Sequence, residues 1–294
     1  TTSNEEVNVH HTVEQELIVT PISAQTFTLL TLLRQQQMTP NYKIIVFFST
    51  ARLTECMAQL FHEMQIPVLE MHSRKAQAHR NRVSEHFRRS DGVILFSSDV
   101  SARGMDYPNI TCVVQVGMAN SKAQYIHRIG RTGRAGGPQP GRCFLLLADF
   151  ERAFVKTIDD LGIKEIQAPI PEDGDAQVGL MIGGLDTLAP TKKKDIDQTY
   201  TSWLGFYISS RKILELEADT ILEMGKEYIT GLFTLDEAPA LESRTAEEMG
   251  LVRLQPEKKK FFGKRAGDKT RRGVTGTGPK PVLRRDREKG EKKK

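Results

Sequence analysis

The sequence predicts an α/β protein built on a doubly wound parallel sheet with helices on both faces. Strand-like and helix-like segments alternate strictly over about 150 residues, as they do when helices connect parallel strands. Short runs such as 43–48 are apolar at nearly every position, which is typical of strands buried on both faces. The 294 residues suffice for one compact domain with appendages or for two domains.

The predicted strands rest on two patterns. The first strand alternates apolar and polar side chains, whereas most of the others are short runs of branched and aromatic residues. The strands are expected at residues 13–19, 43–48, 68–71, 92–96, 110–116 and 143–147.

The predicted helices between these strands carry apolar residues at steps of three and four. One of them begins at Ser121, which forms a capping-box pattern with Gln124. The helices are expected at residues 22–37, 51–65, 75–89, from 121 onward, and 150–161. We therefore predict an entry linker at 1–12 and the α/β domain at 13–168.

The pattern changes beyond residue 168. Residues 169–196 are rich in glycine, proline and small residues, so we expect an irregular connector. Residues 197–256 return to helical spacing, with aromatic side chains that include the single tryptophan, Trp203. We expect this helical extension to pack on the α/β domain; the alternative is a binding face for RNA or a partner protein.

The basic charge is concentrated in a tail, residues 257–294. The tail holds 16 of the 42 Lys and Arg residues and 5 of the 37 Asp and Glu residues, a net charge of +11, so the remainder carries −6. A cationic segment with few apolar residues cannot bury enough surface to fold, and it attracts polyanions. We expect a disordered tail that contacts nucleic acid.

The positions of the cysteines argue against two kinds of cysteine site. Cys56, Cys112 and Cys143 lie in apolar segments without a Cys-x-x-Cys pair, which argues against a disulfide framework and against a zinc site. His79 and His86 share a helix face but have no evident third ligand, so we expect no bound metal. No apolar run approaches the length of a bilayer span, and we expect an intracellular protein without membrane contact.

Polar residues follow three of the predicted strands. The carboxyl ends of parallel strands meet at one edge of a sheet, where helix N-termini and free backbone amides also gather. We therefore expect a phosphate-binding edge, although the same hydroxyls also serve as ordinary helix caps. The residues are Ser49 and Thr50, His72 and Ser73, and Ser97, Ser98 and Asp99.

Three arginines follow one another at steps of three in residues 128–134. This spacing places Arg128, Arg131 and Arg134 along one face of a helix and its trailing turn. Their forked donors suit phosphate oxygens, whereas a solvated basic face is the alternative. The interleaved glycines favour phosphate binding, because they weaken a helix unless backbone must approach closely. They are Gly130, Gly133, Gly136 and Gly137.

Four segments in order resemble the motifs of DEAD-box RNA helicases. His127-Arg-Ile-Gly-Arg-Thr-Gly-Arg134 looks like motif VI and Ser98-Asp-Val-Ser-Ala-Arg-Gly-Met-Asp106 looks like motif V, while 44–50 and 71–80 resemble motifs IV and IVa. The resemblance implies the second RecA-like lobe of such a helicase. Where this sequence has Ser98 the family usually has threonine, and where it has Ser73 the family often has glycine.

The resemblance implies a role for each matched residue. Arg131 and Arg134 would be catalytic arginine fingers on the γ-phosphate of ATP, while Gly104 and Asp106 would approach its ribose. The residues that would couple the two lobes are Arg103, His127 and Arg128. The residues that would contact the RNA backbone, without reading its sequence, are Ser49, Thr50, Ser73, Gln77, Arg80, Ser98 and Asp99.

The sequence contains no Gly-x-x-x-x-Gly-Lys-[Ser/Thr] phosphate loop. The resemblance therefore implies that ATP and Mg²⁺ are held mainly by the first RecA-like lobe of a longer protein. We expect the complete protein to be a monomeric, RNA-dependent ATPase that separates short duplexes, and this chain alone to be inactive. The alternatives are a standalone RNA-binding module and a protein-binding scaffold.

The extension carries a further resemblance. The segment 200–207, followed by helices and a basic tail, is similar to the C-terminal extension of fungal mitochondrial DEAD-box RNA chaperones that assist splicing. This similarity implies a mitochondrial protein, with the nucleus or nucleolus as the alternative.

Overall fold

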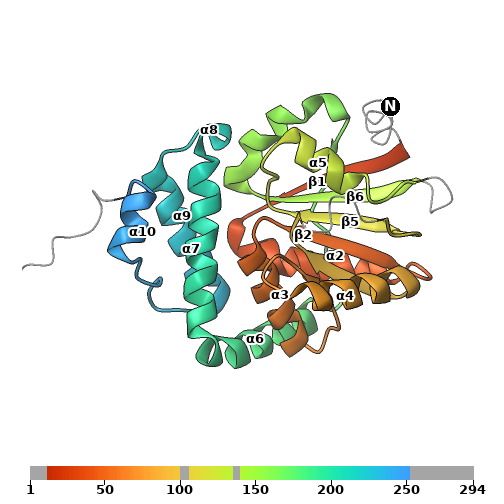
Figure 1. Cartoon of the computed structure of the whole chain (residues 1–294), viewed down its shortest axis with the longest axis horizontal. Coiled ribbons are helices and arrows are strands. Elements are labelled where there is room, and N and C mark those ends of the chain that lie inside the picture. Colours follow the sequence, from red (N-terminus) through yellow and green to blue (C-terminus); the bar gives the residue numbers. More distant parts are fainter. Residues whose placement is uncertain (1–11, 100–105, 135–139, 252–294) are drawn as a thin grey trace, which may run out of the picture. The chain divides into compact units, whose positions relative to one another are not determined.

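A seven-stranded parallel sheet forms the middle layer of the α/β domain (Figure 1). The computed structural model describes residues 12–99, 106–134 and 140–251. The strands lie in the order β3-β4-β2-β5-β6-β1-β7. Their bounds are β1 Val13–Thr20, β2 Lys43–Phe48, β3 Leu69–Met71, β4 Val93–Ser97, β5 Cys112–Val116, β6 Gly141–Ala148 and β7 Lys164–Glu165. All six predicted strands are confirmed, and the two-residue β7 is an addition that no sequence pattern indicated.

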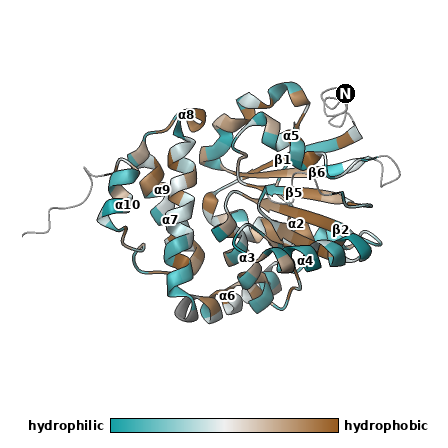
Figure 2. Cartoon of the chain, viewed as in Figure 1, coloured by the Kyte–Doolittle hydropathy of each residue, from teal (hydrophilic) through white to brown (hydrophobic). Residues whose placement is uncertain are grey.

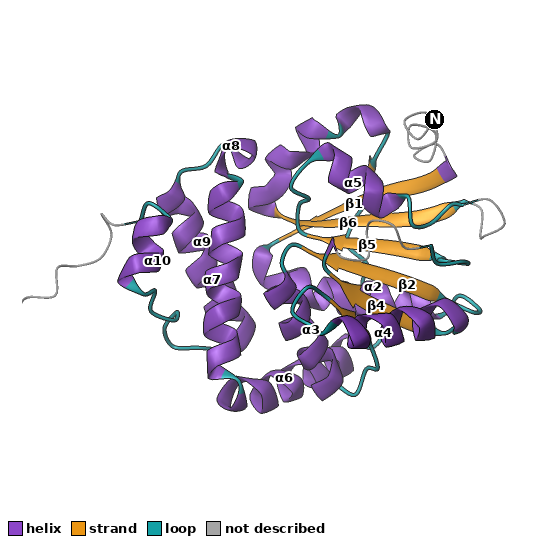
Figure 3. Cartoon of the chain, in the orientation of Figure 1, coloured by secondary structure: helices purple, strands orange, loops and turns teal. Residues whose placement is uncertain are grey.

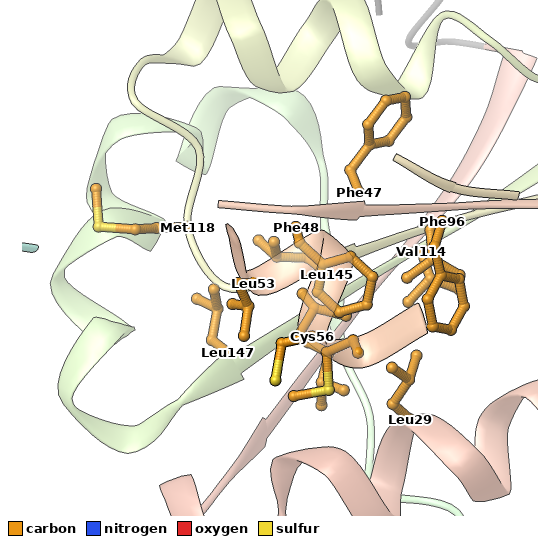
Figure 4. Packing of buried hydrophobic residues seen from close by; sticks show 14 of the residues in the cluster. Leu29, Phe47, Phe48, Leu53, Cys56, Phe96, Val114, Met118, Leu145 and Leu147 are labelled. Carbon is orange, nitrogen blue, oxygen red and sulfur yellow. The ribbon is translucent and has the colours of Figure 1, made fainter. Parts of the chain in front are cut away.

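Helices cover both faces of the sheet, as predicted. Because side chains alternate along a strand, Phe47 and Phe48 of β2 point to opposite faces, which Figure 4 shows directly. Phe48 packs on Phe96, whose ring meets that of Phe61 in α3 at 4.9 Å, while Phe47 lies under Arg128 of α5. The helices of this domain are α2 Gln25–Gln37, α3 Ala51–Glu63, α4 Gln77–Arg89 and α5 Lys122–Ile129.

The sheet domain has the apolar core that the strand patterns predicted. Figure 2 shows hydrophobic residues concentrated along the strands, and Ile44 through Phe48 have no exposed side-chain surface. The three cysteines are free and buried, as expected. Burial raises the pKa of the Cys56 thiol to about 12, so this thiol stays protonated at neutral pH.

The segment after β6 differs from the predicted helix 150–161. The chain forms two 3₁₀ helices instead, η4 Asp149–Thr157 and η5 Asp159–Leu161. The side chain of Glu151 turns inward and accepts a hydrogen bond from the backbone amide of Ala148 at 2.8 Å. The apolar spacing predicted a helical segment correctly but could not distinguish the tighter helix from an α-helix.

The prediction that 169–196 is irregular is wrong. Helix α6, Gly174–Thr191, occupies most of this segment (Figure 3). A Cβ atom on Gly184 would lie 2.8 Å from Met64 Cγ and 3.3 Å from Leu60 Cδ1, so this glycine permits close packing against α3. The small residues that suggested a loop are therefore partly packing residues.

The extension beyond α6 is helical, as predicted, and packs on the sheet domain. Its helices are α7 Lys193–Ser209, α8 Arg211–Leu214, α9 Ala218–Phe233 and α10 Ser243–Glu248. The ring of Trp203 stacks on Tyr228 of α9 at 5.4 Å and lies 5.8 Å from Phe150, which follows β6. The aromatic stripe is buried against the α/β domain, and the predicted tail, 257–294, lies outside the described residues.

Candidate functional site

The predicted polar loops lie together at one edge of the sheet. β3, β4 and β2 are neighbours in that order, so their carboxyl ends are adjacent. Both the Ser97 hydroxyl and the Ser98 backbone amide donate to the carbonyl of Met71, at 3.0 and 3.1 Å. These bonds tie the end of β4 to the end of β3.

The hydroxyl residues at this edge differ in exposure. Ser49 and Ser98 are buried, whereas Ser73 is exposed. Thr50 caps α3, because its hydroxyl accepts a hydrogen bond from the Leu53 amide at 3.1 Å. Of the predicted RNA contacts in these loops, the exposed Ser73 and the partly exposed Thr50 and Asp99 offer surface to a ligand in this conformation.

The first turn of α4 presents the other two predicted RNA contacts. Gln77 is exposed and Arg80 partly so, and the Arg80 guanidinium donates to Gln77 Oε1 at 2.5 Å. Gln77 in turn donates to Asn81 Oδ1 at 2.7 Å. These amide and guanidinium donors could exchange their mutual bonds for phosphate oxygens at small cost, because they are solvated.

Arg128 is not on the surface. Its side chain has no exposed surface, and both Nε and Nη2 lie 2.9 Å from Asp99 Oδ1. The guanidinium also lies over the Phe47 ring at 5.4 Å, and Gln124 donates to the other Asp99 oxygen at 2.6 Å. Asp99 and Arg128 thus join β4 to α5, and the Asp99 side chain keeps 35% of its surface exposed.

Burial distinguishes Arg128 from the two later arginines of the predicted row. Helix α5 ends at Ile129, so Arg131 and Arg134 lie in the turns that follow it. The Arg131 Nε donates to the His127 carbonyl at 3.2 Å, and the Arg134 Nε donates to the Gly130 carbonyl at 2.8 Å. Both guanidinium groups fold back over the end of α5.

Asp106 forms an ion pair with Arg134. The Asp106 side chain is 81% exposed and that of Arg134 is 36% exposed, so solvent or a ligand can reach both. The structure thus brings together two residues that the sequence analysis assigned to different parts of ATP. His127 is partly buried in α5, while Arg103 and Gly104 lie outside the described residues.

Gly133 has the close backbone approach that the interleaved glycines predicted. Its φ of +68° is left-handed, and a Cβ there would lie 2.8 Å from Val13 Cγ2 and 2.9 Å from the Thr12 carbonyl oxygen. The Thr12 hydroxyl donates to the Gly133 carbonyl at 3.0 Å. The segment between Arg131 and Arg134 is therefore anchored to the start of β1.

Several residues that hold this site carry no sequence signal that singles them out. Thr132 donates to the carbonyl of Ile110 at 2.6 Å, which fixes the same segment from its other side. Tyr107 donates to Ser84 at 3.1 Å. Burial raises the pKa of its hydroxyl, and the hydrogen bond with Ser84 and the positive charges of Arg88 and Arg131 oppose that rise. A tyrosine beside Asp106 carries no distinctive spacing, so sequence alone could not single it out.

The described residues contain no group of three His, Cys, Asp or Glu side chains suited to a metal ion. None of the helices in the described ranges is long and apolar enough to cross a membrane.

Sequence comparisons connect this arrangement with helicases. The family model of the helicase conserved C-terminal domain matches residues 25–136. The probable DEAD-box ATP-dependent RNA helicase 48 of Arabidopsis thaliana is 41% identical over 246 residues, 83% of this chain and 30% of that protein. DEAD-box ATP-dependent RNA helicase 31 of Oryza sativa subsp. japonica is 39% identical over 251 residues, 82% of this chain and 43% of that protein. The chain thus spans less than half the length of either relative.

Solved structures share the fold. Domain 2 of the DEAD-box helicase Mss116p, bound to an RNA duplex, has a TM-score of 0.67 and 26% identity, covering 82% of this chain and 95% of that one. Mss116 bound to single-stranded RNA and UDP-BeF has a TM-score of 0.68 and 25% identity, covering 82% and 48%. The chain therefore has the RecA-like fold of the second domain of DEAD-box helicases, and its sequence is similar to those of DEAD-box ATP-dependent RNA helicases.

Proposed function

We propose that this chain is the second lobe of an ATP-dependent RNA helicase, which grips the RNA backbone and supplies Arg131 and Arg134 to ATP bound by a first lobe. The observation that carries the proposal is the pair of guanidinium groups at the end of α5, with Arg134 held by the exposed Asp106. Two forked cations at the edge of a sheet suit the oxygens of a polyphosphate.

The ion pair with Asp106 keeps Arg134 in place until a phosphate arrives. An exposed ion pair contributes little free energy, so a γ-phosphate can displace the carboxylate. The freed Asp106 carboxylate is then available to accept a hydrogen bond from a ribose hydroxyl. Both residues would thus serve one nucleotide, with Arg131 and Arg134 neutralising charge on the transferring phosphoryl group.

RNA would bind at the neighbouring loops. Ser73, Gln77 and Arg80 lie at the start of α4, where hydroxyl, amide and guanidinium donors face solvent. Such donors bind phosphate and 2′-hydroxyl groups without distinguishing bases. Closure of the two lobes on ATP would bend the bound strand and open a short duplex.

ATP and Mg²⁺ would depend on the first lobe. The sequence has no phosphate loop, and the described residues offer no cluster for a metal ion. Arg131 and Arg134 suit the phosphate oxygens of the nucleotide and Asp106 suits a ribose hydroxyl, whereas the metal and the phosphate loop would come from the partner lobe. We therefore propose that the isolated chain binds RNA weakly and does not hydrolyse ATP.

The test uses a protein that carries both lobes. Arg131→Ala should lower kcat of RNA-stimulated ATP hydrolysis by about 10³-fold, the effect of removing an arginine finger, while RNA affinity without nucleotide stays unchanged. Arg152→Ala is the matched control, because Arg152 forms an exposed ion pair with Glu165 and is not assigned to ATP or RNA. An equal loss of ATPase activity and RNA affinity would contradict the assignment.

A compartment can be proposed from the extension. Its similarity to mitochondrial RNA chaperones suggests action on structured RNA in mitochondria. Fractionation of cells that express the full-length protein tests this assignment, and recovery in nuclei would refute it.

A further inference from the structure

We propose that Tyr207 and Glu151 are positioning residues for the arginine motif, through which the helical extension fixes the loop that begins α5. The inference rests on the proposed function, because the motif in question is the one that carries Arg131. It adds a role for the extension that differs from contacting RNA.

Glu151 joins three parts of the fold. Its side chain is fully buried directly after β6. Oε1 accepts hydrogen bonds from the Met118 amide and from the Tyr207 hydroxyl, both at 2.7 Å, while Oε2 accepts one from the Ala148 amide at 2.8 Å. A single carboxylate therefore links the loops after β5 and β6 to helix α7.

The loop after β5 is packed directly against this pair. Gly117 has a φ of +79°, and a Cβ there would lie 2.9 Å from the Tyr207 hydroxyl and 3.2 Å from Glu151 Oε1. The Gly117 amide donates to the Leu146 carbonyl at 2.9 Å. Gly117 and Met118 are thus fixed from β6, from Glu151 and from Tyr207, which leaves this loop little freedom.

The loop leads into α5 within three residues. Ser121 caps the helix, because its hydroxyl accepts a hydrogen bond from the Gln124 amide at 3.2 Å. The Gln124 side chain accepts from the Asn120 amide at 2.5 Å, which completes the cap. A shift of Met118 would therefore move the first turn of α5, and with it the end of the helix where Arg131 lies.

The Tyr207 ring can stay in place when its hydroxyl is removed. The ring packs on Phe150 at 5.0 Å, Trp203 at 4.2 Å and Phe206 at 4.9 Å. Removing only the hydroxyl leaves the Glu151 carboxylate with one donor fewer. Burial already raises the pKa of Glu151, so this loss favours the protonated acid, which can no longer accept all of its bonds.

The test compares Tyr207→Phe with Tyr200→Phe. Tyr200 lies two turns earlier on α7 and is equally buried, but no hydrogen bond joins it to Glu151 in the described part of the chain. We expect amide exchange of Met118 to be about tenfold faster in Tyr207→Phe, the effect of losing one buried hydrogen bond. In the two-lobe protein, kcat should fall about three- to tenfold while KM for ATP and RNA affinity remain unchanged. Tyr200→Phe should change none of these values.

Two results would overturn the inference. One is a Tyr207→Phe protein with the wild-type exchange rate at Met118 and the wild-type kcat. The other is an equal loss in both variants, which would mean that the extension only stabilises the fold. Failure of the proposed function is a separate result, since it appears as absent ATPase activity in the wild type, whereas amide exchange is measured without ATP.

Discussion

Substitution of Gly133 by alanine tests whether the arginine segment depends on its close approach to the start of β1. Two costs add at this position. A side chain in the left-handed conformation, φ +68°, costs about 1–2 kcal/mol. The new Cβ would also lie 2.8 Å from Val13 Cγ2 and 2.9 Å from a backbone oxygen, an overlap that costs about 1–3 kcal/mol.

The free energy of unfolding should therefore fall by about 2–5 kcal/mol in Gly133→Ala, a large part of the stability of a typical domain. Urea unfolding followed by circular dichroism and by fluorescence of the single tryptophan, Trp203, measures this change. The matched control is Gly162→Ala. Gly162 also has a positive φ, +71°, but no atom lies within 4 Å of its Cβ position, so only the conformational cost of about 1–2 kcal/mol applies.

Equal losses in the two variants would refute the reasoning, because the close approach would then contribute nothing. A functional readout follows from the same geometry. Gly133 lies between Arg131 and Arg134, so a shift of this segment that relieves the overlap would displace at least one of these arginines. In the two-lobe protein, Gly133→Ala should lower kcat of ATP hydrolysis, whereas Gly162→Ala should leave it unchanged.

Three further predictions follow from buried and terminal charges. Arg128→Met should lower the free energy of unfolding by about 2–4 kcal/mol, because it leaves the partly exposed Asp99 without its buried partner. In the same urea assay, Arg152→Ala should lower it by less than about 1 kcal/mol, since that ion pair is exposed. Similar losses in the two variants would contradict a stabilising role for the Arg128–Asp99 pair. Burial raises the pKa of Glu151 above its ordinary 4.5, so the folded state binds this proton more tightly than the unfolded state. The difference in free energy of unfolding between wild type and Glu151→Gln should therefore shrink as pH rises from 4.5 through the raised pKa. A difference that grows with pH over this range would contradict the direction of the shift. Deletion of residues 257–294 should weaken RNA binding and flatten its dependence on salt, since the tail carries a net charge of +11; an unchanged slope in a salt titration would exclude tail contacts.

The sheet could be predicted because its signals are local. Each run of apolar residues is short, and the alternation with helices leaves few topologies once crossovers are right-handed. The segment 169–196 misled for the same reason: glycine weakens an isolated helix, but Gly184 is favoured where α6 packs closely on α3. Helix α6 forms because of its tertiary contacts with α3, and local sequence patterns do not contain such contacts.

The site was predicted as a set of residue types rather than as a geometry. Sequence spacing placed Arg128, Arg131 and Arg134 in one row, but it could not show that Asp99 draws Arg128 into the interior. The pairing of Asp106 with Arg134 also joins positions 28 residues apart, beyond any periodic signal. Contacts between distant loops at a sheet edge depend on strand order, which the motif spacing does not contain.

The burial of Arg128 gives the arginine motif two different tasks. A buried guanidinium is tolerated only with a partner, so Arg128 must keep its contact with Asp99, and this contact fixes the distance between β4 and α5. Arg131 and Arg134 follow the helix end. Their guanidinium groups donate to backbone carbonyls, and Arg134 also pairs with the exposed Asp106, so a ligand can recruit them at small cost. The rigid first arginine therefore holds the end of α5 in place while the later two exchange partners. For this reason, loss of Arg128 should impair stability and catalysis together, whereas loss of Arg131 should impair catalysis alone.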